Sequence, residues 1–326
     1  MDSHELLDPF DKLLADVAAP ARTREIEAGK PVNELWEALQ ESGFLDALAP
    51  EDAGGVGLSL HDAAPLLQAL GRHAVAAPVA ETMVARALLG REGIECPEGP
   101  IVLAPLHSFR SAVTPLARVA THALVQVDAT LVLTPLAAAT LVETGVHRSL
   151  AGVLSWGSPP AGPSIPAPAV GLRAVAAVLR ACAIAGAADR LLEMTTAYAR
   201  DRVQFGKPIG KLQAIQQQLS VMAEQVVAAR LASQLGCAGG LPPSLEAAAV
   251  AKQVSSIAAV PVAEIAHAVH GAIGISEEYD LQLYTRRLHE WRLADGSESY
   301  WAGVLGAARL EAAEQTSVDF IRAKAG

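Results

Sequence analysis

The feature that most constrains the fold is a long stretch of helix-forming sequence in the second half of the chain. Residues 170–200 are rich in alanine and contain no proline, and alanine is the strongest helix former whereas proline breaks helices. A second helical pattern follows, in which apolar residues recur every three or four positions and so share one face of a helix. These residues are Leu212, Ile215, Leu219, Met222 and Val226. Two long helices this close in sequence favour a helical hairpin over a sheet.

Further helices follow towards the C-terminus. A turn at 239–243 precedes a helical pattern over 246–270, and Gly271 and Gly274 end that pattern before a last helical region. Four long helices joined by short turns predict an antiparallel four-helix bundle over residues 169–326.

The part of the chain before this bundle reads as two units. Residues 1–97 show short helical patterns separated by breakers, of which the Gly-Gly segment at 49–57 is the clearest. In residues 98–168 the segments 101–104 and 130–133 are short and suited to strands, and prolines recur. The predicted fold is therefore mainly α, with an N-terminal helical domain at 1–97, a reduced middle β domain at 98–168 and the C-terminal bundle.

Composition and charge disfavour several classes of function. Hydrophobic residues make up 51% of the chain, aromatics only 4%, and the mean hydropathy is +0.29, so small aliphatic residues suited to packed helices carry the apolar share. No apolar run approaches the roughly 18 residues of a membrane helix, and the start MDSHELLDPF does not resemble a signal peptide. A net charge of -10 disfavours nucleic acid as a partner. We therefore expect a cytoplasmic protein with no membrane or nucleic-acid partner.

The cysteines are few, odd in number and far apart in the sequence: Cys96, Cys182 and Cys237. Such spacing argues against a disulfide framework and against a cysteine metal site. We expect a reducing compartment and no metal.

The break between the first two bundle helices carries residues that a simple turn does not need. Gly206 and Pro208 suffice to turn the chain. Arg202 and Phe205 nevertheless stand beside them, and Gln213 follows one turn into the next helix. A guanidinium suits a phosphate and an aromatic ring suits a base, so this group would fit a nucleotide with a diphosphate. The simpler alternative is that Arg202 is solvated or stabilises the end of its helix.

Three segments resemble the acyl-CoA dehydrogenase family. The sequence RVQFGKPI at 202–209 is similar to the family signature R-x-Q-F-G-x-P-I, and AVHGAIG at 268–274 is similar to its Q-x-H-G-G-x-G-F segment. The stretch 35–82 resembles the N-terminal helical domain of the family, including its Gly-Gly loop. The three segments occur in family order and span both helical regions.

The resemblance implies a flavoprotein that introduces a double bond between Cα and Cβ of an acyl-CoA thioester. It also implies FAD bound between subunits and an electron-accepting flavoprotein as a partner. In the family the hinge signature holds the ADP half of the FAD of a neighbouring subunit, which implies that role for Arg202, Phe205 and Gln213.

Two further parts of the family's site map onto the C-terminal region. The glycine segment contacts the same end of FAD, which implies that role for His270, Gly271 and Gly274, although a helix-capping role is the alternative for the histidine. The family's base is commonly a glutamate in a Y-E-G-T-like loop, and the matching loop here holds Asp295 and Ser297. The resemblance implies that Asp295, one methylene shorter, takes the α-proton and that Ser297 contacts the cofactor. An Asp-Gly pair is also ordinary turn composition, so a turn without chemistry stays an alternative.

Several departures from the family pattern fall around the flavin ring. Ala268 stands where the second motif should begin with glutamine, and Ala272 replaces the second glycine of its pair. The short middle region has no T-E-P-x-A-G-S-D segment. Some actinobacterial members, mostly associated with steroid degradation, are mixed tetramers of two different subunits with fewer flavin sites than chains. The resemblance therefore implies a short subunit that works with a homologous acyl-CoA dehydrogenase subunit, with a homo-oligomer as the alternative.

Functions of two classes follow. The first is FAD-dependent α,β-dehydrogenation of an acyl-CoA thioester, of which steroid-derived thioesters are one class, by a subunit of a mixed oligomer. The second is a non-catalytic structural subunit that supports FAD binding by a sister chain, and an oxidase or flavin monooxygenase on the same scaffold is a third. We also expect an oligomer built through the C-terminal bundle, because the 212–226 seam and the 170–200 helix offer more apolar surface than one bundle should leave exposed.

Overall fold

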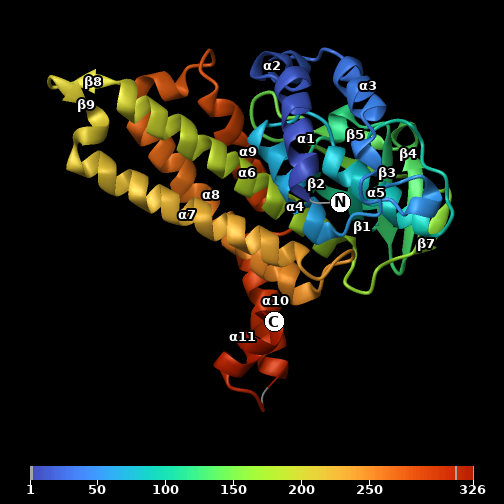
Figure 1. Cartoon of the computed structure of the whole chain (residues 1–326). Helices are drawn as coiled ribbons and strands as arrows, with labels where there is room; N and C mark the ends of the chain where they lie inside the picture. The colour runs from blue at the N-terminus through green and yellow to red at the C-terminus, as the bar shows by residue number, and fades with distance from the viewer. Residues whose placement is uncertain (1–2, 313, 326) are drawn as a thin grey trace.

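The computed structural model describes residues 3–312 and 314–325, and they form an N-terminal helical region, a middle sheet and a C-terminal helical bundle (Figure 1). The N-terminal region comprises the helices α1 (Ser3–Val17), α2 (Pro20–Glu27), α3 (Asn33–Glu41), α4 (Leu60–Arg72) and α5 (Val79–Arg91). The 3-10 turns η1 (Phe44–Asp46) and η2 (Glu51–Ala53) connect α3 to α4. The breaker segment at 49–57 is thus a connection between helices, as its Gly-Gly pair predicts.

The middle region is a mixed sheet. Its strands are β1 (Ile101–His107), β2 (Arg110–Thr114), β3 (His122–Val127), β4 (Thr130–Pro135), β5 (Thr140–Glu143), β6 (Gly152–Ser155) and β7 (Ser164–Pro166). Their order is β5-β6-β2-β1-β3-β4-β7, with β1 and β3 parallel and the other neighbours antiparallel. Leu124 pairs with Leu103 on one side and Leu133 on the other, and all three are buried in the cluster that also holds residues of α4, α5 and α6. The strands predicted at 101–104 and 130–133 are confirmed.

The C-terminal region is built on four long helices. These are α6 (Leu172–Asp201), α7 (Gln213–Cys237), α8 (Leu245–His270) and α9 (Leu281–Leu293). They pack against one another as a bundle beside the sheet (Figure 1). The predicted fold, mainly α with a small β region in the middle and a C-terminal four-helix bundle, is confirmed.

Helix α8, together with the turn that follows it, is long and apolar enough to cross a membrane by length and composition alone (Leu245–Ile275). In this fold α8 contacts α6, α7, α9 and α10. It also carries a lysine and serines, Lys252, Ser255 and Ser256, into the interior of the bundle. Its apolar composition is therefore accounted for by its central place in the bundle.

Helices α4 and α6 cross at a point where only glycine fits. A Cβ atom on Gly186 would lie 1.8 Å from the carbonyl oxygen of Gln68, and one on Gly71 would lie 2.0 Å from that of Ala183. Both distances are far inside van der Waals contact, so the two glycines permit the close approach of the backbones. This contact fixes the N-terminal helices against the bundle.

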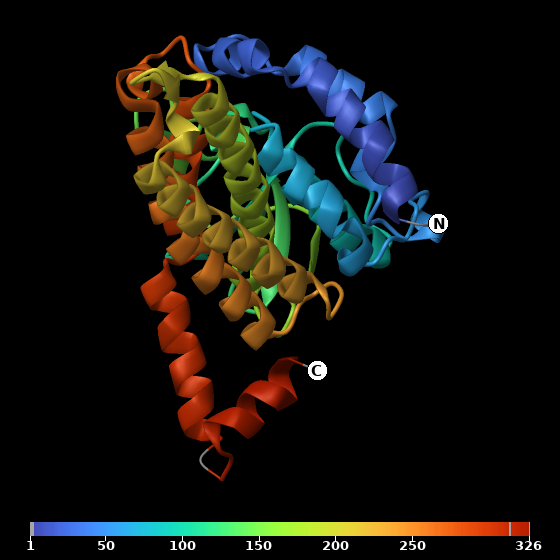
Figure 2. The ribbon, with the colours of Figure 1, turned by 60° about the vertical axis from the view of Figure 1, so that its left-hand side comes forward.

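The last two helices leave the body of the protein. Helices α10 (Glu298–Glu311) and α11 (Ser317–Ala325) extend from the bundle as a V-shaped arm (Figure 2). Arg309 holds the bend of the arm by donating to the carbonyl oxygens of Ala312 at 3.1 Å and Gln315 at 2.7 Å. Leu310 and Ile321 on the arm are largely exposed.

The seam predicted to contact another chain lies inside this one. Met222 and Val226 are fully buried in the bundle, and the rest of the seam packs partly buried against the end of α6. Most of α6 is buried as well. The argument from these two helices was therefore wrong, because their own neighbours cover the apolar faces. The apolar side chains that α7 leaves exposed lie on another face: Val221, Val227, Leu231 and Leu235.

Candidate active site

The segment between α6 and α7 is a small β-hairpin at the end of the bundle farthest from the sheet (Figure 1). Strands β8 (Val203–Gln204) and β9 (Lys207–Pro208) pair across a two-residue turn formed by Phe205 and Gly206. Both turn residues have positive φ, 52° for Phe205 and 74° for Gly206. Two positive φ values in succession are what a type I′ turn requires. A phenylalanine in this conformation is strained by about 1–2 kcal/mol.

The backbone of the hairpin is fixed while its side chains are free. The N–H of Arg202 donates to the carbonyl oxygen of Tyr198, and the N–H of Ile209 donates to that of Arg202, both at 2.8 Å. The side chain of Phe205 is 87% exposed, and Arg202 and Gln213 are exposed as well. Within residues 3–312 and 314–325, neither Arg202 nor Gln213 has a side-chain hydrogen bond or ion pair. The three predicted nucleotide contacts therefore point to solvent.

The glycine segment lies at the same end of the bundle but is differently held. His270 is buried, stacks on Tyr198 at 4.4 Å between ring centroids and packs against Tyr279 at 5.2 Å. Its Nδ1 lies 2.8 Å from the carbonyl oxygen of Ala266, and burial lowers its pKa. Gly274 is buried beside Leu281 and the Cβ atom of His270, whereas Gly271 is exposed. His270 thus has a packing role in this chain, and its predicted contact with FAD stays a prediction.

The turn between α9 and α10 holds the predicted base. Asp295 and Gly296 both have positive φ, 58° and 101°. Ser297 is the N-cap of α10, where its hydroxyl accepts from the N–H of Tyr300 at 3.4 Å. The indole N–H of Trp301 donates to the carbonyl oxygen of Asp295 at 3.1 Å. The role of Ser297 that the structure describes is helix capping, and its contact with a cofactor stays a prediction.

The carboxylate of Asp295 belongs to a buried group of charges, called here the Asp295 network: Glu81, Arg180, Lys252 and Asp295. Arg180 Nε lies 3.2 Å from Asp295 Oδ2, and Arg180 Nη2 lies 2.6 Å from Glu81 Oε1. The Asp295 side chain is only 10% exposed, and those of Arg180 and Glu81 are buried. The neighbouring carboxylates raise the pKa of Arg180 against the effect of its burial. Asp295 therefore already has a counter-ion.

Lys252 is the second cation of this network. Its Nζ donates to the carbonyl oxygens of Arg292 at 2.8 Å and Gly296 at 2.9 Å, and to Ser256 Oγ at 2.9 Å. Burial lowers the pKa of Lys252 to about 7, an effect that the negative charge of Asp295 partly offsets. Because both carbonyl groups flank Asp295, Lys252 fixes the backbone of the turn while Arg180 fixes the side chain.

A cavity of about 550 Å³ lies between the sheet and this turn. Its size is in the range of small-molecule sites. It is lined mostly by apolar groups, such as Val113, Val146 and Leu293, and by the polar residues Thr114, Thr144, Arg173, His289, Glu290 and Asp295. We call this space the cavity.

Two lining residues of the cavity were not singled out by the sequence. Glu290 Oε2 accepts a hydrogen bond from Ser149 Oγ, and that hydroxyl oxygen accepts from the N–H of Ala151 at 3.0 Å. The Arg173 guanidinium stacks on the ring of Tyr300, 5.2 Å from its centroid. Across the described ranges neither Glu290 nor Arg173 has an ion-pair partner. No sequence motif marks either of them, because the fold alone brings α6, α9 and the sheet together.

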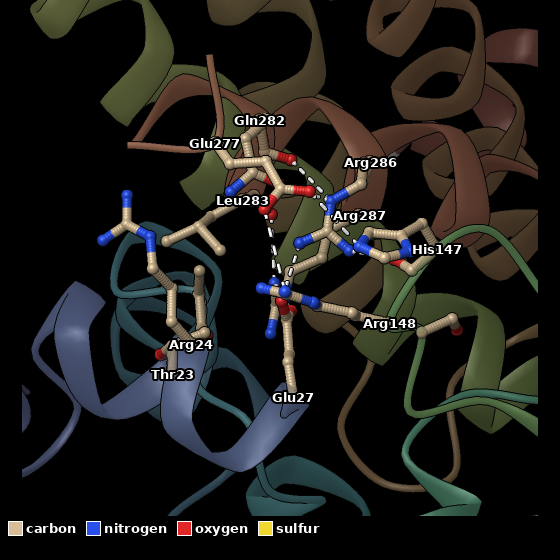
Figure 3. Close-up of polar contacts among 12 residues, drawn as sticks. Thr23, Arg24, Glu27, His147, Arg148, Glu277, Gln282, Leu283, Arg286 and Arg287 are labelled. Carbon is tan, nitrogen blue, oxygen red and sulfur yellow. Dashed lines mark hydrogen bonds and ion pairs between the residues drawn. The ribbon is translucent and has the colours of Figure 1, made fainter. Parts of the chain in front are cut away.

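A second group of charges joins the three regions of the chain (Figure 3). The carboxylate of Glu27 on α2 pairs with Arg286 at 2.6 Å and Arg287 at 2.7 Å. Arg286 also donates to the carbonyl oxygen of His147, in the loop between β5 and β6, at 2.6 Å. The Arg-Arg pair before the predicted base is thus an anchor between regions, with Arg287 buried and Arg286 partly exposed. Among the described residues no group of three or more His, Cys, Asp or Glu side chains could hold a metal ion.

The hairpin fits the nucleotide half of FAD better than the cavity fits its reactive half. A nucleotide needs an exposed cation, an aromatic face and an amide, which the hairpin offers free. A free base for the α-proton is not offered by Asp295 in its present geometry, because Arg180 engages its carboxylate.

Comparison with known proteins agrees with this geometry. The models of the acyl-CoA dehydrogenase N-terminal and C-terminal domains match residues 2–95 and 174–309. Acyl-CoA dehydrogenase IpdE2 of Mycolicibacterium smegmatis is 33% identical over 305 residues, which cover 88% of this chain and 93% of that protein. The chain belongs to the acyl-CoA dehydrogenase family, which is a family of oxidoreductases.

Two solved structures share the fold over nearly the whole chain. The Tcur3481-Tcur3483 steroid ACAD G363A variant matches with a TM-score of 0.82 at 25% identity, covering 96% of this chain and 99% of that chain. The ChsE4-ChsE5 complex from Mycobacterium tuberculosis matches with a TM-score of 0.83 at 22% identity, covering 97% and 98%. The fold of this chain, with a sheet between two helical regions, is therefore shared with these structures.

Proposed function

We propose that this chain is one subunit of a mixed acyl-CoA dehydrogenase assembly that removes hydrogen from Cα and Cβ of an acyl-CoA thioester with FAD as cofactor. The observation that carries the proposal is the hairpin at 202–208, whose nucleotide-binding side chains are free and whose turn holds a phenylalanine at positive φ. Backbone strain of this kind persists only where the surrounding structure enforces it, and it is frequent at ligand-binding sites.

The residues of the hairpin would hold the ADP half of FAD bound mainly by a neighbouring chain. Arg202 would pair with the diphosphate, Phe205 would cover the flat face of the nucleotide and Gln213 would add an amide contact. When bound, FAD supplies the acceptor for the hydride that leaves Cβ. This chain supplies position, charge and an apolar cavity.

The partner is proposed to be a homologous subunit, and the substrate class to include steroid-derived thioesters. Support comes from the two structural neighbours, one of which is named as a steroid ACAD and the other as a complex of two proteins. The exposed apolar side chains on α7 and on the arm are the surfaces that a second chain would cover, although a homo-oligomer would cover them too. A cytoplasmic location and an electron-accepting flavoprotein complete the proposal.

The test is purification of the tagged full chain alone and from its own host together with the subunits that it retains. The visible flavin spectrum and the mass of each assembly are recorded. The proposal expects flavin and an acyl-CoA-dependent bleaching of its absorbance in the mixed assembly. A flavin-free monomer at micromolar concentration in both preparations would contradict it.

The second candidate is a non-catalytic subunit that supports FAD binding by its sister chain. The Asp295 network favours it, because the predicted base is held in a buried ion pair. The two candidates share the hairpin and differ in the cavity, so they are separated by whether any side chain of this cavity takes part in turnover.

A further inference from the structure

We infer that Glu290, on the last turn of α9, is the side chain of this cavity that accepts the α-proton of the acyl-CoA. The inference rests on the dehydrogenation proposed above. It assigns the proton-accepting role to a position five residues before the one that the sequence motif indicates.

The carboxylates that line the cavity within the described residues are those of Glu290 and Asp295. Asp295 is held by Arg180 at 3.2 Å, and Arg180 is itself buried and shared with Glu81. Rotating Asp295 towards a ligand would leave a buried guanidinium with half of its counter-charge, which is strongly unfavourable. The carboxylate of Asp295 therefore has a structural role as the counter-ion of Arg180.

Glu290 is held in a way that suits a base. Its Oε2 accepts from Ser149 Oγ, whose own oxygen accepts from the N–H of Ala151 at 3.0 Å, so the hydroxyl proton is directed to Glu290. A hydroxyl orients a carboxylate without supplying a counter-charge. Its Oε1 has no hydrogen-bond or ion-pair partner in the described part of the chain. One oxygen is thus fixed and the other is available to a proton.

The rest of the cavity suits the charge that such a step produces. The Cα–H bond of the thioester breaks, the proton forms an O–H bond with Glu290, and the electron pair delocalises onto the thioester oxygen. Arg173 lines the same cavity and, among the described residues, has no carboxylate partner, so its positive charge favours the enolate oxygen. The step needs no oxidant and is reversible, so it can be followed as exchange of the α-hydrogen with solvent.

The rival explanation is that Glu290 only ties α9 to the sheet through Ser149. Two substitutions separate the explanations. Glu290→Gln keeps an oxygen that can accept from Ser149 but removes the proton acceptor. Ser149→Ala removes the tie and keeps the carboxylate. If Glu290 is the proton acceptor, Glu290→Gln should lower exchange of the α-hydrogen more than Ser149→Ala does. If Glu290 only holds α9 to the sheet, Ser149→Ala should lower exchange at least as much.

The experiment measures deuterium uptake at Cα in D2O by mass spectrometry, with butyryl-CoA, palmitoyl-CoA and cholyl-CoA as probes. The protein is the full chain in the flavin-carrying assembly purified from its own host. We expect Glu290→Gln to lower exchange by about a hundredfold or more, with unchanged flavin content and unfolding temperature, and Ser149→Ala to lower it by less than about tenfold. Glu277→Gln, at an exposed glutamate outside the cavity, is the matched control and should exchange like the wild type.

Two results would overturn the inference. They are wild-type exchange in Glu290→Gln and equal losses in Glu290→Gln and Ser149→Ala. In the first case, loss of exchange in a folded Asp295→Asn variant would return the role of the base to Asp295. If the wild-type assembly exchanges none of the probes and none of them bleaches its flavin, the proposed function itself fails. Wild-type exchange with an active Glu290→Gln variant removes only the role of Glu290.

Discussion

The two segments that carry the family pattern differ in how their side chains are held. In the hairpin the backbone is fixed by hydrogen bonds, while Arg202 and Phe205 project into solvent. In the α9–α10 turn Lys252 fixes the backbone and Arg180 fixes the side chain of Asp295. Side chains without partners in their own chain are available to bind another molecule. Side chains that are all engaged in ion pairs and hydrogen bonds stabilise the fold instead. Sequence similarity alone does not separate these two states.

The largest expected effect is on the free energy of unfolding and tests the Asp295 network. Arg180→Ala leaves the carboxylates of Glu81 and Asp295 buried without their cation, which should lower the free energy of unfolding by about 3–5 kcal/mol. The measurement is urea denaturation at neutral pH. Arg200→Ala, which breaks only the exposed pair with Asp201, is the control and should change stability by about 0.5 kcal/mol or less. Equal losses in the two variants would show that the network is not structural.

The next largest effect is on flavin retention and tests the hairpin. Arg202→Ala should leave unfolding unchanged, because its guanidinium has no partner in the described chain, but should weaken flavin retention. Losing a charge-assisted contact to a diphosphate costs about 1.5–3 kcal/mol, or roughly ten- to a hundredfold in affinity. Flavin occupancy after dilution and gel filtration measures this. Full occupancy in the variant would remove Arg202 from the cofactor site.

The pH dependence of stability sharpens the comparison inside the network. Burial lowers the pKa of Lys252 to about 7. Above that pH, up to the ordinary pKa of a lysine, the unfolded chain binds a proton that the folded chain lacks. Stability attributable to this group therefore rises with pH, by at most about 1.4 kcal/mol per pH unit. Lys252→Met should flatten the rise between pH 7 and 9 in urea titrations, and an identical slope in the variant would contradict the assignment.

The smallest expected effect is at Phe205, where one substitution should raise stability and lower flavin retention. Phe205→Gly relieves a positive φ at a turn position that favours glycine, so the hairpin should gain about 1 kcal/mol at most. Flavin retention should fall at the same time, because the aromatic face is lost. Thermal unfolding and flavin occupancy measured on the same sample test both. Unchanged flavin occupancy in the variant would remove the ring of Phe205 from the cofactor site.

The sequence predicted those features that depend on local pattern. Helix periodicity, proline placement and the Gly-Gly break were enough for the mainly α fold and for strands near 101 and 130. The family signature placed the break between α6 and α7, whereas the β-hairpin that forms this break was not predicted. What lay beyond prediction depends on contacts between distant segments. Arg180 and Asp295 are 115 positions apart, and Ser149 and Glu290 are 141 apart, so no local pattern reports either pair.

The error about the 212–226 seam has the same origin. Periodicity shows that a helix has an apolar face, but it does not show which neighbour covers that face. Met222 and Val226 are covered by α6, α8 and α9 of the same chain. The exposed apolar residues on α7 also share one helix face, since Val227, Leu231 and Leu235 recur every four positions, but the sequence analysis considered only the other face.

The position of the hairpin, at the far end of the bundle from the sheet and its cavity, has a genetic consequence (Figure 1). In the proposed mixed assembly, an Arg202 variant should therefore impair the flavin site of the partner subunit, whereas a Glu290 variant should impair the site in its own chain. Substitutions at the two positions should thus lower flavin binding and α-hydrogen exchange at different sites of one assembly.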